Sequence, residues 1–333
     1  MMVIFKASYY PVHLSVDSLF GATPDMAREQ FGICAEANLH GFVFLINALD
    51  GHHAQLRLQL ARVPALVQHL SDQFSESNLS AVIAVGAGYW DSLYPAVRPQ
   101  NLHSFPPLVV DDLEMPASPF DLLLQIRSDR YDVLHLAAQQ CFQLLQPYVE
   151  IQEQIHAFRY MDGRDLTGFI DEPRAPKGRR KREFALVSAG ADPVFAGGSY
   201  LHFQRYRLDL HRWQQLTQSQ QEMIMGYKKM DGSLIPSAQL SAQSHAVCAS
   251  LQSEFNQQLP LLFQNMPYGQ LKVQGMLTLG FSADGTSYLK WLKQRMGQSG
   301  LQNYDLLLDY IQSDCGAAFF APSISFMEQE AGL

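Results

Sequence analysis

Short apolar runs and longer amphipathic stretches alternate along the first half of the chain. Apolar runs that end at polar or glycine-containing turns predict strands, and apolar residues at helical spacing predict helices. The predicted strands are residues 39–47, 79–86, 121–129 and 156–161, and the predicted helices are residues 54–74 and 131–149. In chain order these elements follow the β-α-β-β-α-β pattern of a ferredoxin-like unit.

The second half of the chain shows a comparable but less regular mixture of strands and helices. Its predicted strands are residues 183–187, 199–208, 270–282 and 316–323, and its predicted helices are residues 210–228 and 287–296. The residue identities of the two halves do not visibly repeat, so a duplication is inferred from element order alone. We therefore predict an α+β protein with an N-terminal domain at 1–155 and a C-terminal domain at 156–333.

The composition indicates a globular protein with a large core. Of the 333 residues, 47% are hydrophobic and only 17% are charged, which excludes disordered and fibrous classes. The 24 Lys and Arg against 32 Asp and Glu give a net charge of −8. This charge disfavours general binding to nucleic acid or to anionic membrane surfaces. No apolar run approaches the roughly 18 residues that a membrane-spanning helix needs.

The cysteines and the start of the chain favour a cytoplasmic protein. Cys34, Cys141, Cys248 and Cys315 lie far apart and form no CxxC pair, so reduced thiols are expected instead of disulfides or a zinc site. Polar residues interrupt the first residues of the chain, unlike a signal peptide. A basic run at 177–182 is expected to be a solvated loop, and a nucleic-acid or anion site is the alternative.

One stretch, FRYMDGRDLTGFIDEPRAPKGRRKREFALV at 158–187, is the most informative about function. Further segments follow it in order: GGSYLHFQRY at 197–206, LHRWQQLTQSQQEMIMGYKK at 210–229, SHAVCA at 244–249, NMPYG at 265–269 and AAFFAPS at 317–323. In the first half they are joined by WDSLYP at 90–95 and RYDVLHL at 130–136. Over nearly the whole chain, this set resembles the dye-decolorizing (DyP-type) haem peroxidases. The resemblance implies two ferredoxin-like domains that pack as a β-barrel-like core with peripheral helices, and a haem site in the C-terminal domain.

The resemblance also implies roles for single residues. His245 matches the haem-iron ligand, and a neutral imidazole is a good axial ligand whose basicity a neighbouring carboxylate raises. Asp309 is the expected carboxylate. Asp171 matches the distal aspartate that moves a proton between the peroxide oxygens, and Asn265 matches a distal asparagine. Without the resemblance, these would be interpreted as an ordinary histidine, a turn aspartate and a loop amide.

The chain departs from the family pattern at several positions near the expected site. Phe263 stands where the family has its distal arginine, and Cys248 replaces an arginine that can pair with a haem propionate. Glu172 replaces the glycine that ends the aspartate motif, and Ala175 replaces an asparagine. Arg174 is a possible substitute cation. Cys248 is interpreted as a buried cysteine, with thiolate ligation of iron as the alternative.

These features together predict a haem b (iron protoporphyrin IX) enzyme of the DyP type with low activity. It would reduce hydrogen peroxide and oxidise dyes or phenolic compounds one electron at a time. The resemblance further implies a homodimer or higher homo-oligomer, and neither nucleic acid nor a membrane is an expected partner. The alternative is a haem-binding protein for storage, sensing or a partner subunit that has lost peroxidase activity.

Overall fold

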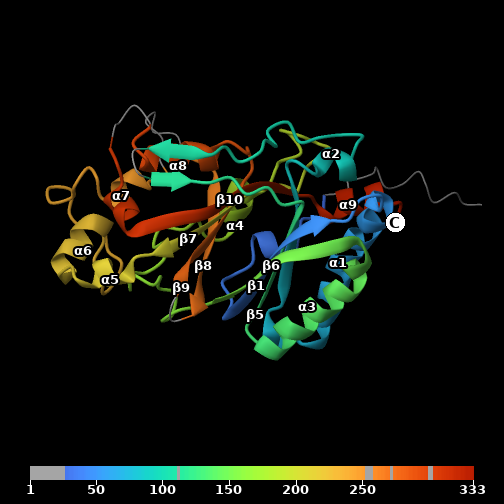
Figure 1. The fold of residues 1–333 in the computed structure, drawn as a ribbon, viewed down its shortest axis with the longest axis horizontal. Helices are drawn as coiled ribbons and strands as arrows, with labels where there is room; N and C mark the ends of the chain where they lie inside the picture. Colours follow the sequence, from blue (N-terminus) through green and yellow to red (C-terminus); the bar gives the residue numbers. More distant parts are fainter. Residues whose placement is uncertain (1–26, 111–112, 252–257, 271–272, 299–302) are drawn as a thin grey trace, which may run out of the picture.

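The centre of the molecule is a closed barrel of antiparallel strands (Figure 1). The computed structural model describes residues 27–110, 113–251, 258–270, 273–298 and 303–333. The barrel strands are β1 (His40–Ala48), β2 (Ser80–Gly86), β5 (Leu122–Ser128), β6 (Val149–Phe158), β7 (Ser199–Leu208), β8 (Leu261–Gln270), β9 (Val273–Ser282) and β10 (Ile311–Ala321). Their order around the barrel is β1-β5-β2-β10-β7-β9-β8-β6.

The barrel consists of two four-stranded halves with the same topology. In the first half the spatial order is β6-β1-β5-β2, and in the second it is β8-β9-β7-β10. In each half the first and third strands lie in the centre, as in a ferredoxin-like unit. The halves join through the pairs β2–β10 and β6–β8. The predicted fold class is confirmed, and the expected domain division at residue 155 falls inside β6.

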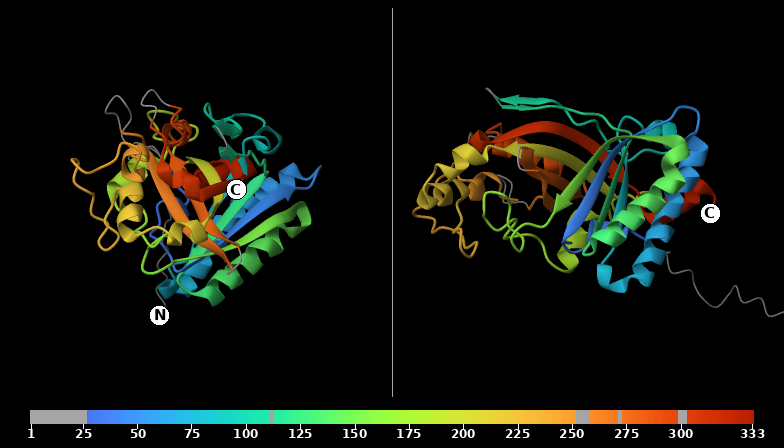
Figure 2. Two further views of the ribbon diagram at one scale, coloured as in Figure 1. Left: turned by 60° about the vertical axis from the view of Figure 1, so that its left-hand side comes forward. Right: turned by 60° about the horizontal axis from the view of Figure 1, so that its bottom comes forward.

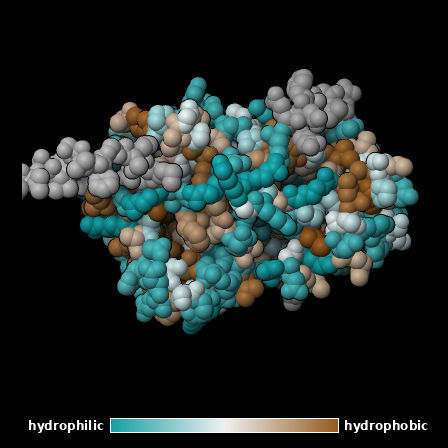
Figure 3. Space-filling model, turned by 180° about the vertical axis from the view of Figure 1, so that it is seen from behind, coloured by the Kyte–Doolittle hydropathy of each residue, from teal (hydrophilic) through white to brown (hydrophobic). Residues whose placement is uncertain are grey.

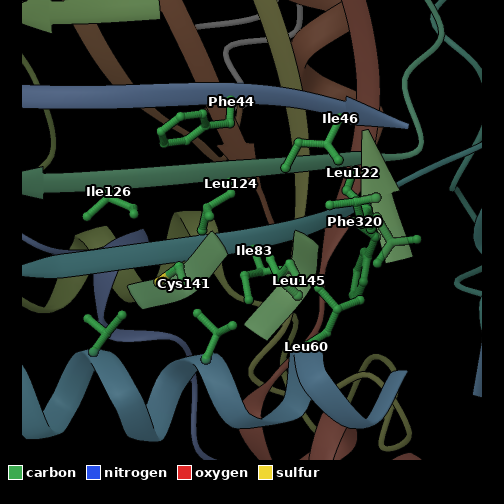
Figure 4. Close-up of a cluster of buried hydrophobic side chains, with 14 of the residues drawn as sticks. Phe44, Ile46, Leu60, Ile83, Leu122, Leu124, Ile126, Cys141, Leu145 and Phe320 are labelled. Atoms are coloured by element: carbon green, nitrogen blue, oxygen red, sulfur yellow. The ribbon is translucent and has the colours of Figure 1, made fainter. Parts of the chain in front are cut away.

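Two long helices cover the outer face of the N-terminal half. They are α1 (His53–Gln73) and α3 (Tyr131–Leu145). Because side chains alternate along a strand, Phe44 and Ile46 face these helices, whereas Val43 and Leu45 face the barrel interior. Figure 4 shows Leu60 of α1 pointing towards the strands, in the cluster of buried side chains that includes Phe44 and Ile46.

The remaining helices lie mainly on the second half of the barrel. They are α4 (Arg179–Ala185), α5 (Leu210–Gln214), α6 (Gln218–Met225), α7 (His245–Cys248) and α8 (Ser287–Arg295). Helix α9 (Ile324–Ala331) instead packs against α1 of the first half. Helices α5, α6 and α7 lie at the opposite end of the molecule from α1 and α3 (Figures 1 and 2). Helix α8 packs Tyr288 and Trp291 on the outer face of the sheet. The first half also contains the short helix α2 (Trp90–Leu93) and a hairpin of β3 (Leu108–Val110) and β4 (Leu113–Met115).

Three of the differences from the sequence prediction have a clear physical reason. The strand expected at 183–187 is wrong, because this apolar run forms the end of helix α4. The basic run that precedes it, expected to be a loop, forms the start of the same helix. The single helix expected at 210–228 is two helices, since Thr217 and Gln220 form a capping box that starts α6. Strand β8 was not predicted, because Pro267 and its neighbours are typical of a loop.

The exterior mixes hydrophilic and hydrophobic residues. On the face shown in Figure 3, hydrophilic residues run across the middle. Within the described ranges, no helix is long and apolar enough to cross a membrane.

The contact between the two halves supplies a test of the fold. Phe320 of β10 is fully buried and pairs with Val85 of β2, and its ring contacts those of Trp90 and Tyr200. Phe320→Ala should therefore lower the free energy of unfolding by about 3–5 kcal/mol, measured by urea denaturation. Phe31→Ala is the matched control, because the Phe31 side chain is 69% exposed, and it should change stability by less than about 0.5 kcal/mol. Equal losses in the two variants would contradict this account of the core.

Candidate active site

A cavity lies on the outer face of the C-terminal half of the barrel. The space among its lining residues, including its open mouth, is about 830 Å³. Strand alternation directs Phe263 and Asn265 of β8 into it, together with Met276 and Thr278 of β9. The cavity is also lined by the 165–173 loop and by residues of helices α6, α7 and α8. All its lining residues come from positions 165–311.

His245, at the start of α7, presents one edge of its ring to this cavity and the other to a carboxylate. Its Nδ1 lies 2.8 Å from Oδ2 of Asp305, which is completely buried. Within the described ranges, Nε2 of His245 makes no hydrogen bond. A histidine whose Nδ1 is bound to a carboxylate and whose Nε2 is free has the arrangement of a metal-binding imidazole.

Asp305 is shared between the imidazole and a buried arginine. Nε of Arg295 donates to the same Oδ2 atom at 2.7 Å, and Arg295 is only 4% exposed. Burial alone would raise the pKa of Asp305, but the charges of His245 and Arg295 outweigh it and hold that pKa at about 2. Asp305 also accepts from the Leu307 amide and so begins the 3-10 helix at Leu306–Tyr310. The carboxylate is therefore ionised and fixed in position.

The cavity also holds an aspartate and an asparagine that contact each other. Nδ2 of Asn265 donates to Oδ1 of Asp171 at 3.0 Å. Oδ1 of Asn265 is buried and has no hydrogen-bond partner within the described ranges. A buried polar atom of this kind is usually satisfied by water or a ligand.

The carboxyl groups of Asp171 and Glu172 are in a setting that favours their neutral forms. Burial, then the charges of Glu172 and Asp165, raise the pKa of Asp171 well above its usual range. Burial likewise raises the pKa of Glu172, although the charges of His245 and Arg295 oppose the rise. Glu172 also has a backbone φ of 43°, in the left-handed region that glycine adopts without strain.

Phe263 supplies an aromatic wall to the cavity. Its ring centroid lies 4.7 Å from that of Trp291 and 6.2 Å from that of Tyr288. Arg174, the possible substitute cation, is exposed, and its guanidinium lies over the ring of Tyr227, 5.5 Å from the centroid. Arg174 is not among the residues that line the cavity.

The structure thus brings together His245, Asp171, Phe263 and Asn265, and it corrects the expected partner of His245. Asp309 is exposed and accepts from the Tyr304 hydroxyl at 3.0 Å. The turn of the 3-10 helix directs Asp309 away from the cavity. Asp305 is therefore the carboxylate that contacts His245, in place of the expected Asp309. Sequence reasoning also missed Arg295. Its spacing of four residues from Trp291 on an amphipathic helix places both on one face.

Comparisons with known proteins agree with this architecture. A model of the Dyp-type peroxidase N-terminal domain matches residues 33–159, and a model of the C-terminal domain matches residues 162–326. The chain belongs to the Dyp-type peroxidase family. It is a haem peroxidase, and haem is its cofactor.

Individual relatives cover most of the chain. A dye-decolorizing peroxidase of Rhodococcus erythropolis is 30% identical over 86% of this chain and 84% of its own length. A Dyp-type peroxidase protein from Shewanella oneidensis has a crystal structure with a TM-score of 0.88 and 41% identity, covering 92% of this chain and 99% of that one. A variant of DypB from Rhodococcus jostii RHA1, in complex with heme, has a TM-score of 0.82 and 27% identity over 88% and 96% of the two chains.

The residues of the DyP-type cavity fit a haem. The Nε2 atom of His245 faces the cavity with its other ring nitrogen bound to a carboxylate, which is the donor chemistry of an axial ligand. Apolar side chains such as Ile170, Leu208 and Met225 line the same cavity, and an apolar surround suits a porphyrin.

The shared carboxylate supplies a prediction with a matched control. Asp305→Asn leaves the buried Arg295 without its charged partner, so the free energy of unfolding at neutral pH should fall by about 3 kcal/mol or more. Asp309→Asn should change it by less than about 0.5 kcal/mol. Because the folded-state pKa of Asp305 lies below its unfolded value, its stabilisation is present above about pH 4 and lost as the pH falls through about 2. Urea denaturation at pH 7, 4 and 2.5 should show the deficit of Asp305→Asn shrinking below pH 4, and a deficit that does not depend on pH would contradict the assignment.

The backbone of Glu172 supplies a second prediction. Glu172→Gly and Glu172→Ala both remove a carboxyl group beside Asp171, but only glycine relieves the left-handed conformation. The glycine variant should be more stable than the alanine variant by about 1 kcal/mol, measured by thermal or urea unfolding. Alanine at least as stable as glycine would show that the backbone at this position carries no strain.

Proposed function

We propose that this DyP-type peroxidase binds haem through Nε2 of His245 and handles peroxide with Asp171 and Asn265, at low turnover. The observation that carries the proposal is the 2.8 Å contact between Nδ1 of His245 and the buried carboxylate of Asp305. This contact fixes the ring orientation and leaves Nε2 towards the cavity that also contains Asp171 and Asn265. The haem, when bound, would supply the iron that exchanges electrons with peroxide and with the reductant.

Asp305 and Arg295 would together set the electron density at Nε2 of His245. Asp305 accepts from Nδ1 and so makes the imidazole a stronger donor at Nε2. Arg295 also donates to Oδ2 of Asp305, at 2.7 Å, and so reduces the electron density that Asp305 adds to the imidazole. His245 would therefore be a weaker donor than a histidine whose carboxylate serves it alone.

Asp171 and Asn265 would hold peroxide and move its proton. An Oδ atom of ionised Asp171 would accept the proton from one peroxide oxygen and return it to the other. Asn265 would orient the peroxide, because its Oδ1 lacks a partner within the described ranges and its Nδ2 already holds Asp171. Both side chains belong to the same cavity as His245.

Low turnover follows from Phe263. An arginine at this position would stabilise negative charge on the departing oxygen and favour ionised Asp171. Phenylalanine does neither, and the loss of one preorganised donor typically costs about a hundredfold or more in rate. The raised pKa of Asp171 has the same consequence, because a protonated carboxyl group cannot accept the peroxide proton.

Phe263→Arg is therefore expected to raise the rate of the reaction with peroxide at least about tenfold, measured by stopped-flow spectroscopy of the haem-loaded protein. The wild-type rate should rise with pH as Asp171 ionises, and this rise should move to lower pH in the arginine variant. Phe263→Met, which is uncharged, is the control and should not be faster. No gain in the arginine variant, or an equal gain in the methionine variant, would contradict this role of the missing charge. Haem binding without any reaction with peroxide would favour the haem-binding alternative.

Further proposals concern the reducing substrates, the oligomeric state and the location of the enzyme. Hydrogen peroxide and reducing substrates follow from the family, and we propose small aromatic compounds such as phenols or dyes as the reductants. We also propose a homodimer or higher homo-oligomer, to be tested by light scattering. A cytoplasmic location is supported by the four free cysteines at Cys34, Cys141, Cys248 and Cys315.

A further inference from the structure

A second cavity adjoins the wall that carries Asp171 and Asn265. These two residues line both cavities, together with Glu172 and Phe263. The second cavity encloses about 1050 Å³ including its mouth. It opens where β6 and β8 separate, since in the described part of both strands they pair at a single position, Ala157 with Tyr268. The fold therefore gives a second approach to the same wall, from the barrel side.

The lining of this second cavity is rich in positive charge. It includes five cationic side chains: Arg127, Arg159, Arg164, Lys177 and Lys181. Over the described ranges, only Lys181 forms an ion pair, with Glu36. In a chain with a net charge of −8, the four lining cations that form no ion pair over these ranges create a local positive potential. The basic run noted in the sequence supplies Lys177 and Lys181.

Arg127 is the most informative of these cations, because it is buried. The side chain extends from β5 into the barrel interior, and the residue is 3% exposed. Nη2 donates to the Gly32 carbonyl at 2.9 Å, Nη1 makes a long contact of 3.4 Å with the Glu36 carbonyl, and Nε has no partner within the described ranges. Burial lowers its pKa to about 10, so it is still charged at neutral pH. A buried cation without a carboxylate is costly, and an anion at the cavity would offset that cost.

The carboxyl groups in the lining oppose such an anion only weakly. Glu36 is paired with Lys181 and is largely exposed to solvent. Asp171 and Glu172 have raised pKa values, mainly through burial, which reduces their negative charge. Apolar side chains, among them Leu262 and Met266, form other parts of the wall. The cavity thus combines positive charge with apolar surface and is larger than an inorganic anion needs.

We propose that this second cavity binds a small organic monocarboxylate. The carboxylate would be attracted by Arg127, Arg159 and Lys177, and the hydrocarbon part would contact Leu262 and Met266. The site goes beyond the proposed function, because it requires neither haem nor peroxide. Its occupant would lie against the wall that carries Asp171 and Asn265.

The test compares benzoate with benzamide, its neutral isostere, by isothermal titration calorimetry on the full chain with and without haem. Benzoate should bind at one site at least about tenfold more tightly than benzamide, and added salt should weaken it. Arg127→Met should weaken benzoate at least about tenfold. The exposed double variant Arg159→Gln/Lys177→Gln should weaken it roughly threefold, since exposed charges contribute less. Arg62→Gln, an exposed arginine on α1, is the matched control and should change nothing.

Benzoate that binds no more tightly than benzamide would overturn the proposal. So would benzoate that haem displaces, because that ligand would occupy the haem cavity. If Arg127→Met fails to fold, as judged by circular dichroism, the double variant decides, and unchanged affinity in it would overturn the proposal. Benzoate binding in a protein without peroxidase activity would contradict the proposed function and leave this site intact.

Discussion

The geometry of the active site depends on one buried carboxylate. Asp305 is completely excluded from solvent, and a single oxygen of it contacts both His245 and Arg295. Removing a charge from water in this way is favourable only with close partners of opposite charge. The three residues come from α7, α8 and the start of a 3-10 helix, so their contact also fixes three otherwise separate segments around the cavity.

The same contact is linked to Phe263 in the cavity wall through aromatic rings. The Arg295 guanidinium lies 4.9 Å from the centroid of the Trp291 ring, and Trp291 packs against Phe263. An arginine at position 263 would bring a second guanidinium to this cluster, whereas phenylalanine keeps the wall apolar. The guanidinium that lines the cavity, Arg295, is thus already paired with Asp305, and the carboxyl groups of Asp171 and Glu172 have raised pKa values. This distribution is the physical basis for proposing a low rate with peroxide.

Much of the fold could be predicted from local sequence patterns. Strand β7 coincides with the predicted residues 199–208, because apolar and aromatic residues recur along it, at Leu201, Phe203 and Tyr206 among others, and neither glycine nor proline interrupts it. Strand β8 could not be found in this way, because a proline argues against a strand, yet Pro267 lies within the β8–β9 ladder. The residues at 183–187 were misassigned because a short apolar run fits the last turn of a helix as well as a strand.

The site could be predicted only where a motif carried it. His245, Asp171, Phe263 and Asn265 lie in recognisable segments, and the structure places all four at one cavity. Asp305 and Asp309 are separated by three leucines and one turn of 3-10 helix, so sequence position alone does not distinguish the buried carboxylate from the exposed one. The buried Arg295 and Arg127 depend on contacts between distant segments, which no local pattern records.

The most direct test of the central claim is a haem titration of the purified protein, followed by its Soret absorption. The wild type should bind one haem per chain and give the Soret spectrum of a histidine-ligated haem. His245→Ala should lose this spectrum and regain it with added imidazole, whereas Asp309→Asn should match the wild type. An unchanged Soret spectrum in His245→Ala would contradict the account, because another residue would then hold the iron.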